Sequence, residues 1–276
     1  MPIGSCLAAL LLLQTPSSAP SAVAPVALQR PALPPEFVTL DVSSNGAPLV
    51  LELARHSLRA PGAFVRVSGA AGSVDQAPPP VTTYRGSVRG EANSVVLASL
   101  LPTGWSAWLE RDTGERFELE PLGDATHPEL HVVRPALDTP DFRCGASDDP
   151  VRFGPFGDRL ELGTRANVRR CLQLAEIAFD ADLEYYQAKG SSVPAVVAAI
   201  DQILNEVDFF YARDVQITYA LTAYVVRTSA FYVPTGGGNL LDLFRTEWTT
   251  NQAAIPRDMA HLMTGQPGSL IEYGGL

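Results

Sequence analysis

Two kinds of hydrophobic spacing divide this chain of 276 residues, and they constrain its fold more than any other feature. From about residue 37 to 133, apolar and polar residues alternate over short segments that Gly, Pro and Asn separate. Such alternation is typical of β-strands, and turns every ~8–12 residues are typical of an antiparallel sandwich or meander. The first half is therefore expected to be all-β, with strands within 37–43, 49–57, 63–69, 82–90, 94–101, 104–111 and 116–122.

The second half contains one long stretch with helical spacing. Ser192 offers an N-cap, and Pro194 is tolerated in the first turn that follows it. Apolar residues three and four positions apart share one face of this helix, namely Val193, Val197, Ile200, Leu204, Val207 and Tyr211. The opposite face carries polar residues that we interpret as a solvated surface, namely Asp201, Gln202, Asn205 and Glu206.

Strand-like runs lie on both sides of this helix. The apolar run from Cys171 to Phe179 and the β-formers from Val215 to Val226 predict buried strands. A second helix is expected to start near Asn239, since apolar residues follow at intervals of four, namely Leu240, Phe244 and Trp248. With further strands expected at 259–263 and 269–273, the pattern predicts a mixed sheet with helices packed on it.

The segment between the two halves has a different composition. Residues 135–170 combine prolines, glycines and mixed charges without sustained periodicity. This composition is typical of a linker or of an extended segment that covers another surface. We therefore expect a β-rich region at 35–134, a linker at 135–170 and a third region at 171–276.

The N-terminus carries an apolar run from Cys6 to Leu13, followed by small residues and prolines. The run is shorter than the ~20 residues that a helix needs to cross a bilayer. Small residues at Ala19 and Ser21 suit cleavage after Ser21. The sequence therefore predicts a signal peptide at 1–21, a secreted protein and no stable membrane span.

Composition narrows the choice of partners. The chain has 30 acidic and 20 basic residues, and its net charge of -10 disfavours nucleic acid and anionic membranes as partners. The sequence lacks a Gly-x-Ser-x-Gly elbow and a phosphate-binding Gly-Lys-Ser/Thr loop. Once the signal peptide is removed, Cys144 and Cys171 remain, and in an oxidising compartment such a pair most simply forms a disulfide.

Four segments, taken in order, resemble the precursors of reprolysin-like metzincin metallopeptidases of the adamalysin type. Residues 84–121 begin with Tyr-Arg-Gly and resemble the family's pro-segment. Leu174–Tyr186 (LAEIAFDADLEYY) resembles its opening strand, in which Glu176 and Asp182 match the family's acidic positions. Leu240–Trp248 (LLDLFRTEW) and Arg257–Gly265 (RDMAHLMTG) resemble its second helix and the strand that follows it.

The resemblance implies an α+β fold. A β-rich pro-domain at 35–134 would precede a latency segment at 135–170. Residues 171–276 would then form the upper subdomain of a metzincin catalytic domain, a mixed sheet with two helices. The implied function is that of a secreted zinc-dependent metalloendopeptidase that acts on a protein or peptide substrate.

The zinc-binding motif of that family is missing from this sequence, which contains no His-Glu-x-x-His. In the family, histidines of this motif hold Zn²⁺, and its glutamate acts as general base on metal-bound water. We therefore assign no catalytic residue here and expect a precursor fragment that is inactive by itself. Two other functions stay open, a non-catalytic secreted binding or adhesion module and a pro-segment that inhibits a protease.

The resemblance also points to three metal-binding residues. Cys144, within Arg-Cys-Gly, lies where pro-segments of the family place a thiolate that blocks zinc. Glu176 and Asp258 match positions that bind Ca²⁺ in many relatives, although surface or cap contacts would equally explain them. The four histidines lack the spacing of metal ligands, and we expect no metal at any of them.

Overall fold

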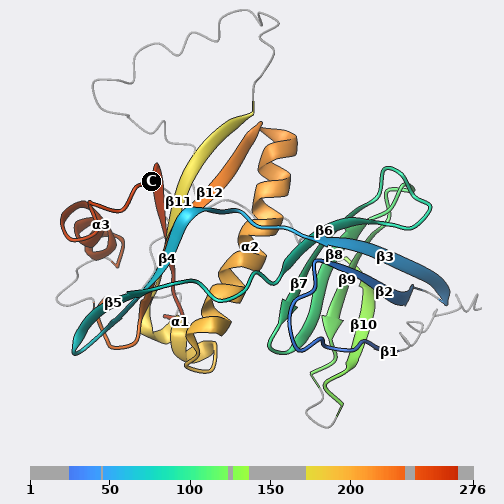
Figure 1. Cartoon of the computed structure of the whole chain (residues 1–276), viewed down its shortest axis with the longest axis horizontal. Helices are drawn as coiled ribbons and strands as arrows, with labels where there is room; N and C mark the ends of the chain where they lie inside the picture. Colours follow the sequence, from blue (N-terminus) through green and yellow to red (C-terminus); the bar gives the residue numbers. More distant parts are fainter. Residues whose placement is uncertain (1–24, 45, 124–126, 137–171, 234–239, 267–276) are drawn as a thin grey trace, which may run out of the picture.

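The computed structural model (Figure 1) describes residues 25–44, 46–123, 127–136, 172–233 and 240–266. These residues form two β-sheets and three helices, and the longest helix lies between the sheets. No helix in these ranges is long and apolar enough to cross a membrane.

The first sheet has eight antiparallel strands in the order β1-β10-β9-β8-β7-β6-β3-β2. Strands β10 and β2, near the two ends of this order, also approach each other, so the sheet is nearly closed, like a barrel. Alternate side chains point inward and form an apolar core around Trp105 and Tyr84. The strands are β1 (Val26–Ala27), β2 (Phe37–Ser44), β3 (Ala47–Arg55), β6 (Thr83–Val88), β7 (Val95–Leu101), β8 (Gly104–Glu110), β9 (Arg116–Pro121) and β10 (Leu130–Pro135).

The second sheet has the order β13-β11-β12-β4-β5. Four neighbouring strands run parallel, and only β5 is antiparallel to its partner β4. The strands are β4 (Arg59–Gly69), β5 (Gly72–Gln76), β11 (Gln173–Ala181), β12 (Ile217–Arg227) and β13 (Met259–Met263). Helix α1 (Leu183–Ala188) follows β11, α2 (Val193–Asp214) connects β11 to β12, and α3 (Leu240–Thr250) lies between β12 and β13. Helices α2 and α3 pack on opposite faces of the sheet.

Both long helices were predicted from their spacing, and the predicted cap of α2 is present, whereas Asn239, the expected cap of α3, lies outside the described residues. The Ser192 hydroxyl accepts a hydrogen bond from the Ala195 N–H, and proline occupies the first turn of α2. Helix α3 begins at Leu240, and β13 covers the expected residues 259–263. These elements are confirmed, whereas the strand expected at 269–273 lies outside the described residues.

The predicted fold class is wrong. Of the described residues, 47% lie in strands and 20% in helices, so the protein is β-rich, and its larger sheet is the nearly closed antiparallel one. The smaller sheet is not the self-contained upper subdomain of a metzincin, because its strands β4 and β5 come from the first half of the chain. Hydrophobic spacing could not reveal that β4 joins the second sheet, since apolar and polar residues alternate in β4 in the same way as in the strands around it. An edge of β12 that would otherwise be unpaired is completed by β4.

Gly86 lies inside strand β6, where it pairs with Leu53 and Val96. A Cβ atom on this residue would lie 1.9 Å from the carbonyl oxygen of Glu52. Only glycine therefore allows β3 and β6 to approach this closely. The next residue toward the N-terminus, Arg85, is thereby held at the surface that faces α2.

We expect Gly86→Ala to lower the free energy of unfolding by about 1–3 kcal/mol, because the added methyl group must push two paired strands apart. The matched control is Arg89→Ala, which changes an exposed side chain on the segment that follows β6 and should stay within about 0.5 kcal/mol of the parent. Urea unfolding measures both variants. Equal stabilities would show that the close approach is not needed.

Candidate functional site

Glu176 and Asp258, the two predicted calcium ligands, lie at neighbouring strands and contact each other. Glu176 lies on β11, and Asp258 immediately precedes β13. The Glu176 N–H donates to Oδ2 of Asp258 at 2.8 Å, and the Asp258 N–H donates to the Glu176 carbonyl oxygen at 2.8 Å. Their contact thus runs through the main chain of Glu176 rather than through two facing carboxylates. Cys144 lies outside the described residues.

The described residues alone do not fit either metal ion. Within these ranges, no three His, Cys, Asp or Glu side chains are placed to hold an ion. Calcium takes about six to eight oxygen ligands, whereas Glu176 and Asp258 contribute two carboxylates, one of which already accepts an N–H. Zinc in proteins takes about four nitrogen, sulfur or oxygen ligands. We therefore derive no reaction step through a metal.

Asp182, the other matched acidic residue, has a structural position at the end of β11. Its Oδ1 accepts the N–H of Tyr185 at 2.7 Å and so caps α1. The same oxygen accepts the N–H of Gly265 at 3.1 Å, and the Thr264 hydroxyl donates to Oδ2. Asp182 therefore ties the end of β13 to the start of α1.

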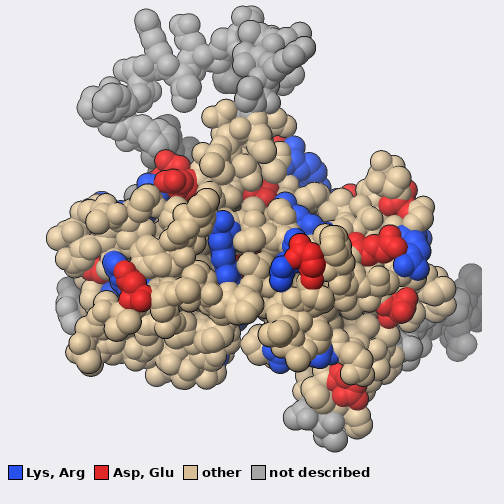
Figure 2. Space-filling view, viewed as in Figure 1, with Lys and Arg blue, Asp and Glu red and all other residues tan. Residues whose placement is uncertain are grey.

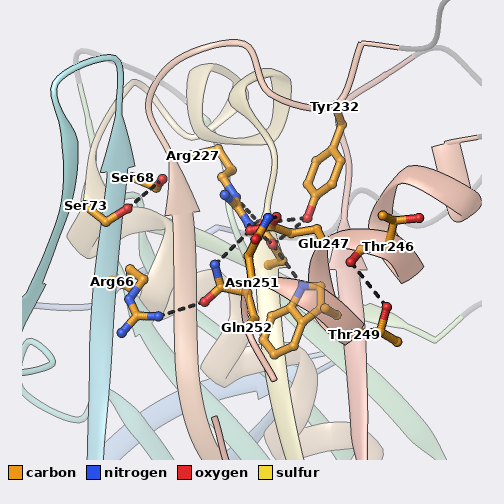
Figure 3. A network of polar contacts seen from close by, with 12 residues as sticks. Arg66, Ser68, Ser73, Arg227, Tyr232, Thr246, Glu247, Thr249, Asn251 and Gln252 are labelled. Atoms are coloured by element: carbon orange, nitrogen blue, oxygen red, sulfur yellow. Dashed lines mark hydrogen bonds and ion pairs between the residues drawn. The ribbon is translucent and has the colours of Figure 1, made fainter. Parts of the chain in front are cut away.

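A buried polar network lies at the carboxyl ends of β11 and β12 (Figure 3). Asp180 of β11 accepts two hydrogen bonds from Arg227 of β12, at 3.0 and 2.7 Å. Arg227 also donates to Glu247 of α3 at 2.9 Å. The three side chains are 0%, 2% and 4% exposed respectively, so this is an ion-pair triad shielded from water.

Neighbouring groups complete the hydrogen bonding of both acids. The Tyr232 hydroxyl and the Trp248 ring N–H donate to Asp180 at 2.7 and 3.0 Å. Gln252 donates to Glu247 at 2.8 Å, and its own amide oxygen accepts from Arg66 of β4 at 2.7 Å. The network therefore extends from α3 to the hairpin that the first half contributes (Figure 3).

The positive charge of Arg227 is balanced by the two carboxylates with which it pairs. Burial alone would lower the pKa of Arg227, but hydrogen bonds and the charge of Asp180 hold that pKa above its ordinary value. Burial raises the pKa of the Tyr232 hydroxyl, and the nearby Asp180 raises it further. Because every charged group here is already paired and enclosed, the arrangement is suited to holding α3 on the sheet rather than to attacking a substrate.

A second polar junction joins α2 to the first half. Arg59 of β4 donates to Asp201 at 2.6 Å, and the Tyr224 hydroxyl also donates to Asp201. One turn and two turns further along α2, Asn205 and Asp208 accept from Arg85. The three α2 residues are only 7%, 2% and 1% exposed.

Arg85 is the centre of this junction. It reaches from β6 to Asn205 Oδ1 at 2.9 Å, to the Asn205 carbonyl oxygen at 2.8 Å and to Asp208 at 2.7 Å. The other carboxylate oxygen of Asp208 accepts from the Thr218 hydroxyl and the Tyr219 N–H, both at 2.7 Å. A single carboxylate thus connects the first sheet, α2 and β12.

Our interpretation of this helix face as solvated is therefore wrong. Asp201, Asn205 and Asp208 are buried against cations that the first half supplies. One signal in the sequence could have indicated this, because the three residues recur at intervals of four and three, which is the spacing of a face in contact. The ion-pair triad was also missed, although Asp180 and Arg227 each follow an apolar strand run.

Comparisons with known proteins add no relative. No protein-family model matches the chain, and a search of curated proteins finds no significant match. The resemblance to metallopeptidase precursors therefore rests on the four quoted segments.

We expect Arg227→Met to cost about 3–5 kcal/mol of stability, because it leaves two buried carboxylates without a cation. The control Arg245→Met removes an exposed partner of Asp242 on the same helix and should cost no more than about 1 kcal/mol. Chemical denaturation compares the two. A similar loss in both variants would mean that the triad does not hold α3 in place.

Proposed function

We propose that this chain is the precursor portion of a secreted zinc-dependent metalloendopeptidase. In this proposal, residues 35–134 are the pro-domain and residues 171–276 belong to the peptidase portion. Four segments that resemble such precursors, in the family's order, support the proposal. The proposal does not rest on the fold class, which differs from the expected one.

The observation that carries the proposal is that the two halves share a β-sheet and bury ion pairs against each other. The first half supplies β4 to the edge of β12, Arg59 to Asp201, and Arg85 to Asp208. A pro-segment that keeps an enzyme latent has to bind it firmly until it is removed. A module that only displays a binding surface would not require charged groups buried between its halves.

The distribution of charge supports a protein or peptide as partner. On the face shown in Figure 2, basic and acidic side chains lie in small scattered groups, some of them mixed, and uncharged residues separate these groups. A nucleic acid would require a continuous basic surface. The net charge of -10 agrees with this reading.

The His-Glu-x-x-His motif that would hold the catalytic zinc is absent from this sequence. Zn²⁺, when bound, would activate water for attack on a peptide carbonyl. In this chain, Cys144 would contribute a thiolate that occupies the position of that water in the latent form. Ca²⁺ at Glu176 and Asp258 would need further oxygen ligands from elsewhere.

The test is to read the coding sequence beyond codon 276 for His-Glu-x-x-His and to assay the longer product. We expect cleavage of a fluorogenic peptide only by the longer product, only after the first half is removed, and only without a zinc chelator. Residues 1–276 by themselves should show no cleavage. A coding sequence without the motif, or a longer product that stays inactive after processing, would refute the proposal and favour a binding module.

A further inference from the structure

His56 occupies the place where the chain crosses from the first sheet to the second, between β3 and β4. Its N–H donates to the Thr83 carbonyl oxygen at 2.9 Å. The Thr83 hydroxyl donates back to the His56 carbonyl oxygen at 2.6 Å. The main chain at this crossing is therefore fixed, and the imidazole ring is held close to the junction with α2.

The imidazole ring itself is incompletely satisfied. Its Nε2 atom is buried and, among the described residues, has no hydrogen-bond partner. The charged groups that act on it are Arg85 from β6 and Asp208 from α2, which pair with each other at 2.7 Å. The pair formed by Arg59 of β4 and Asp201 of α2 belongs to the same junction.

We propose that His56 is an acid-sensitive latch, whose protonation loosens the contact between the first half and helix α2. Protonation of the ring would add a positive charge that Arg85 repels, on an imidazole whose Nε2 atom is buried. Asp208 cannot compensate fully, because one of its oxygens already accepts from Arg85 and the other from Thr218 and Tyr219. Repulsion between the protonated ring and Arg85 would weaken the pairing of Arg85 with Asp208, which is the contact that joins β6 to α2.

The direction of the pH dependence follows from the same surroundings. Burial lowers the pKa of His56, Arg85 lowers it further, and Asp208 only partly offsets these effects. The pKa in the folded state therefore lies below the unfolded value of 6.5. A histidine of this kind stabilises the fold above pH 6.5 and loses that contribution as the pH falls toward its folded pKa.

Under the proposed function, this latch would make release of the pro-domain easier in acidic surroundings. This role in pro-domain release rests on the proposed function, but the acid sensitivity of the contact between the first half and α2 does not. Its test needs no peptidase activity. Either proposal can therefore fail while the other stands.

Hydrogen exchange of the whole chain tests the latch at about pH 7.5 and about pH 5.5, after correction for the intrinsic exchange rates. In the parent protein, α2 and β6 should lose protection by up to about tenfold, because pH 5.5 lies about one pH unit below the unfolded pKa of 6.5. His56→Gln, which cannot take up a proton, should abolish most of that loss. His127→Gln changes an exposed histidine and should behave like the parent.

A second buried histidine predicts acid sensitivity in other strands, so the effect of His56 is recognised by where protection is lost. The buried His131 accepts the Trp105 N–H at Nε2, and burial lowers its pKa, so acid should also loosen β8 and β10. The latch predicts loss at α2 and β6 in addition. An undiminished loss there in His56→Gln would overturn the proposal. Burial also lowers the pKa of His261 on β13, so acid should loosen that strand as well. If the His56→Gln variant does not fold, loss in the parent that spares β6 and the start of β4 would overturn the proposal equally.

Discussion

Charged side chains buried on α2 hold this protein together. An ionised group taken out of water is costly unless an opposite charge and hydrogen bonds replace the water. Among the described residues, Asp201 and Asp208 on α2 form their ion pairs with Arg59 and Arg85, which belong to the first half of the chain. The helix therefore packs on both sides, with an apolar face toward the second sheet and a charged face toward the first half. The two halves cannot separate without leaving the charges of the second face unpaired.

On the opposite face of the second sheet, buried charges are again paired with each other. There the triad of Asp180, Arg227 and Glu247 fixes α3, and Arg66 of the hairpin joins it through Gln252. Strand β4 thus provides a backbone edge for β12 and cations for both faces of the sheet. This dual role explains why a hairpin from the first half is part of the second sheet. It also gives the proposed pro-domain a means of holding its partner from two sides.

Local features of the sequence were sufficient to predict α2, α3 and most strands, since caps and spacing act within a few residues. They were not sufficient for the partner of β4, because strand pairing depends on contacts across more than 150 positions, as between Phe64 and Ala223. The polar face of α2 was misjudged for the same reason, since its cations lie far away in sequence. At the predicted metal residues, the resemblance gave no indication that the N–H of Glu176 would donate to a carboxylate oxygen of Asp258, because such a contact depends on the exact register of the two strands.

Arg85 and Asp208 form one energetic unit between the halves, and a double-mutant cycle measures their coupling directly. Arg85→Met, Asp208→Asn and the double variant are compared with the parent by urea unfolding. We expect each single change to cost more than about 2 kcal/mol and the double variant to cost at least about 1 kcal/mol less than their sum. Strictly additive losses would instead mean that the two charges contribute to stability independently of each other.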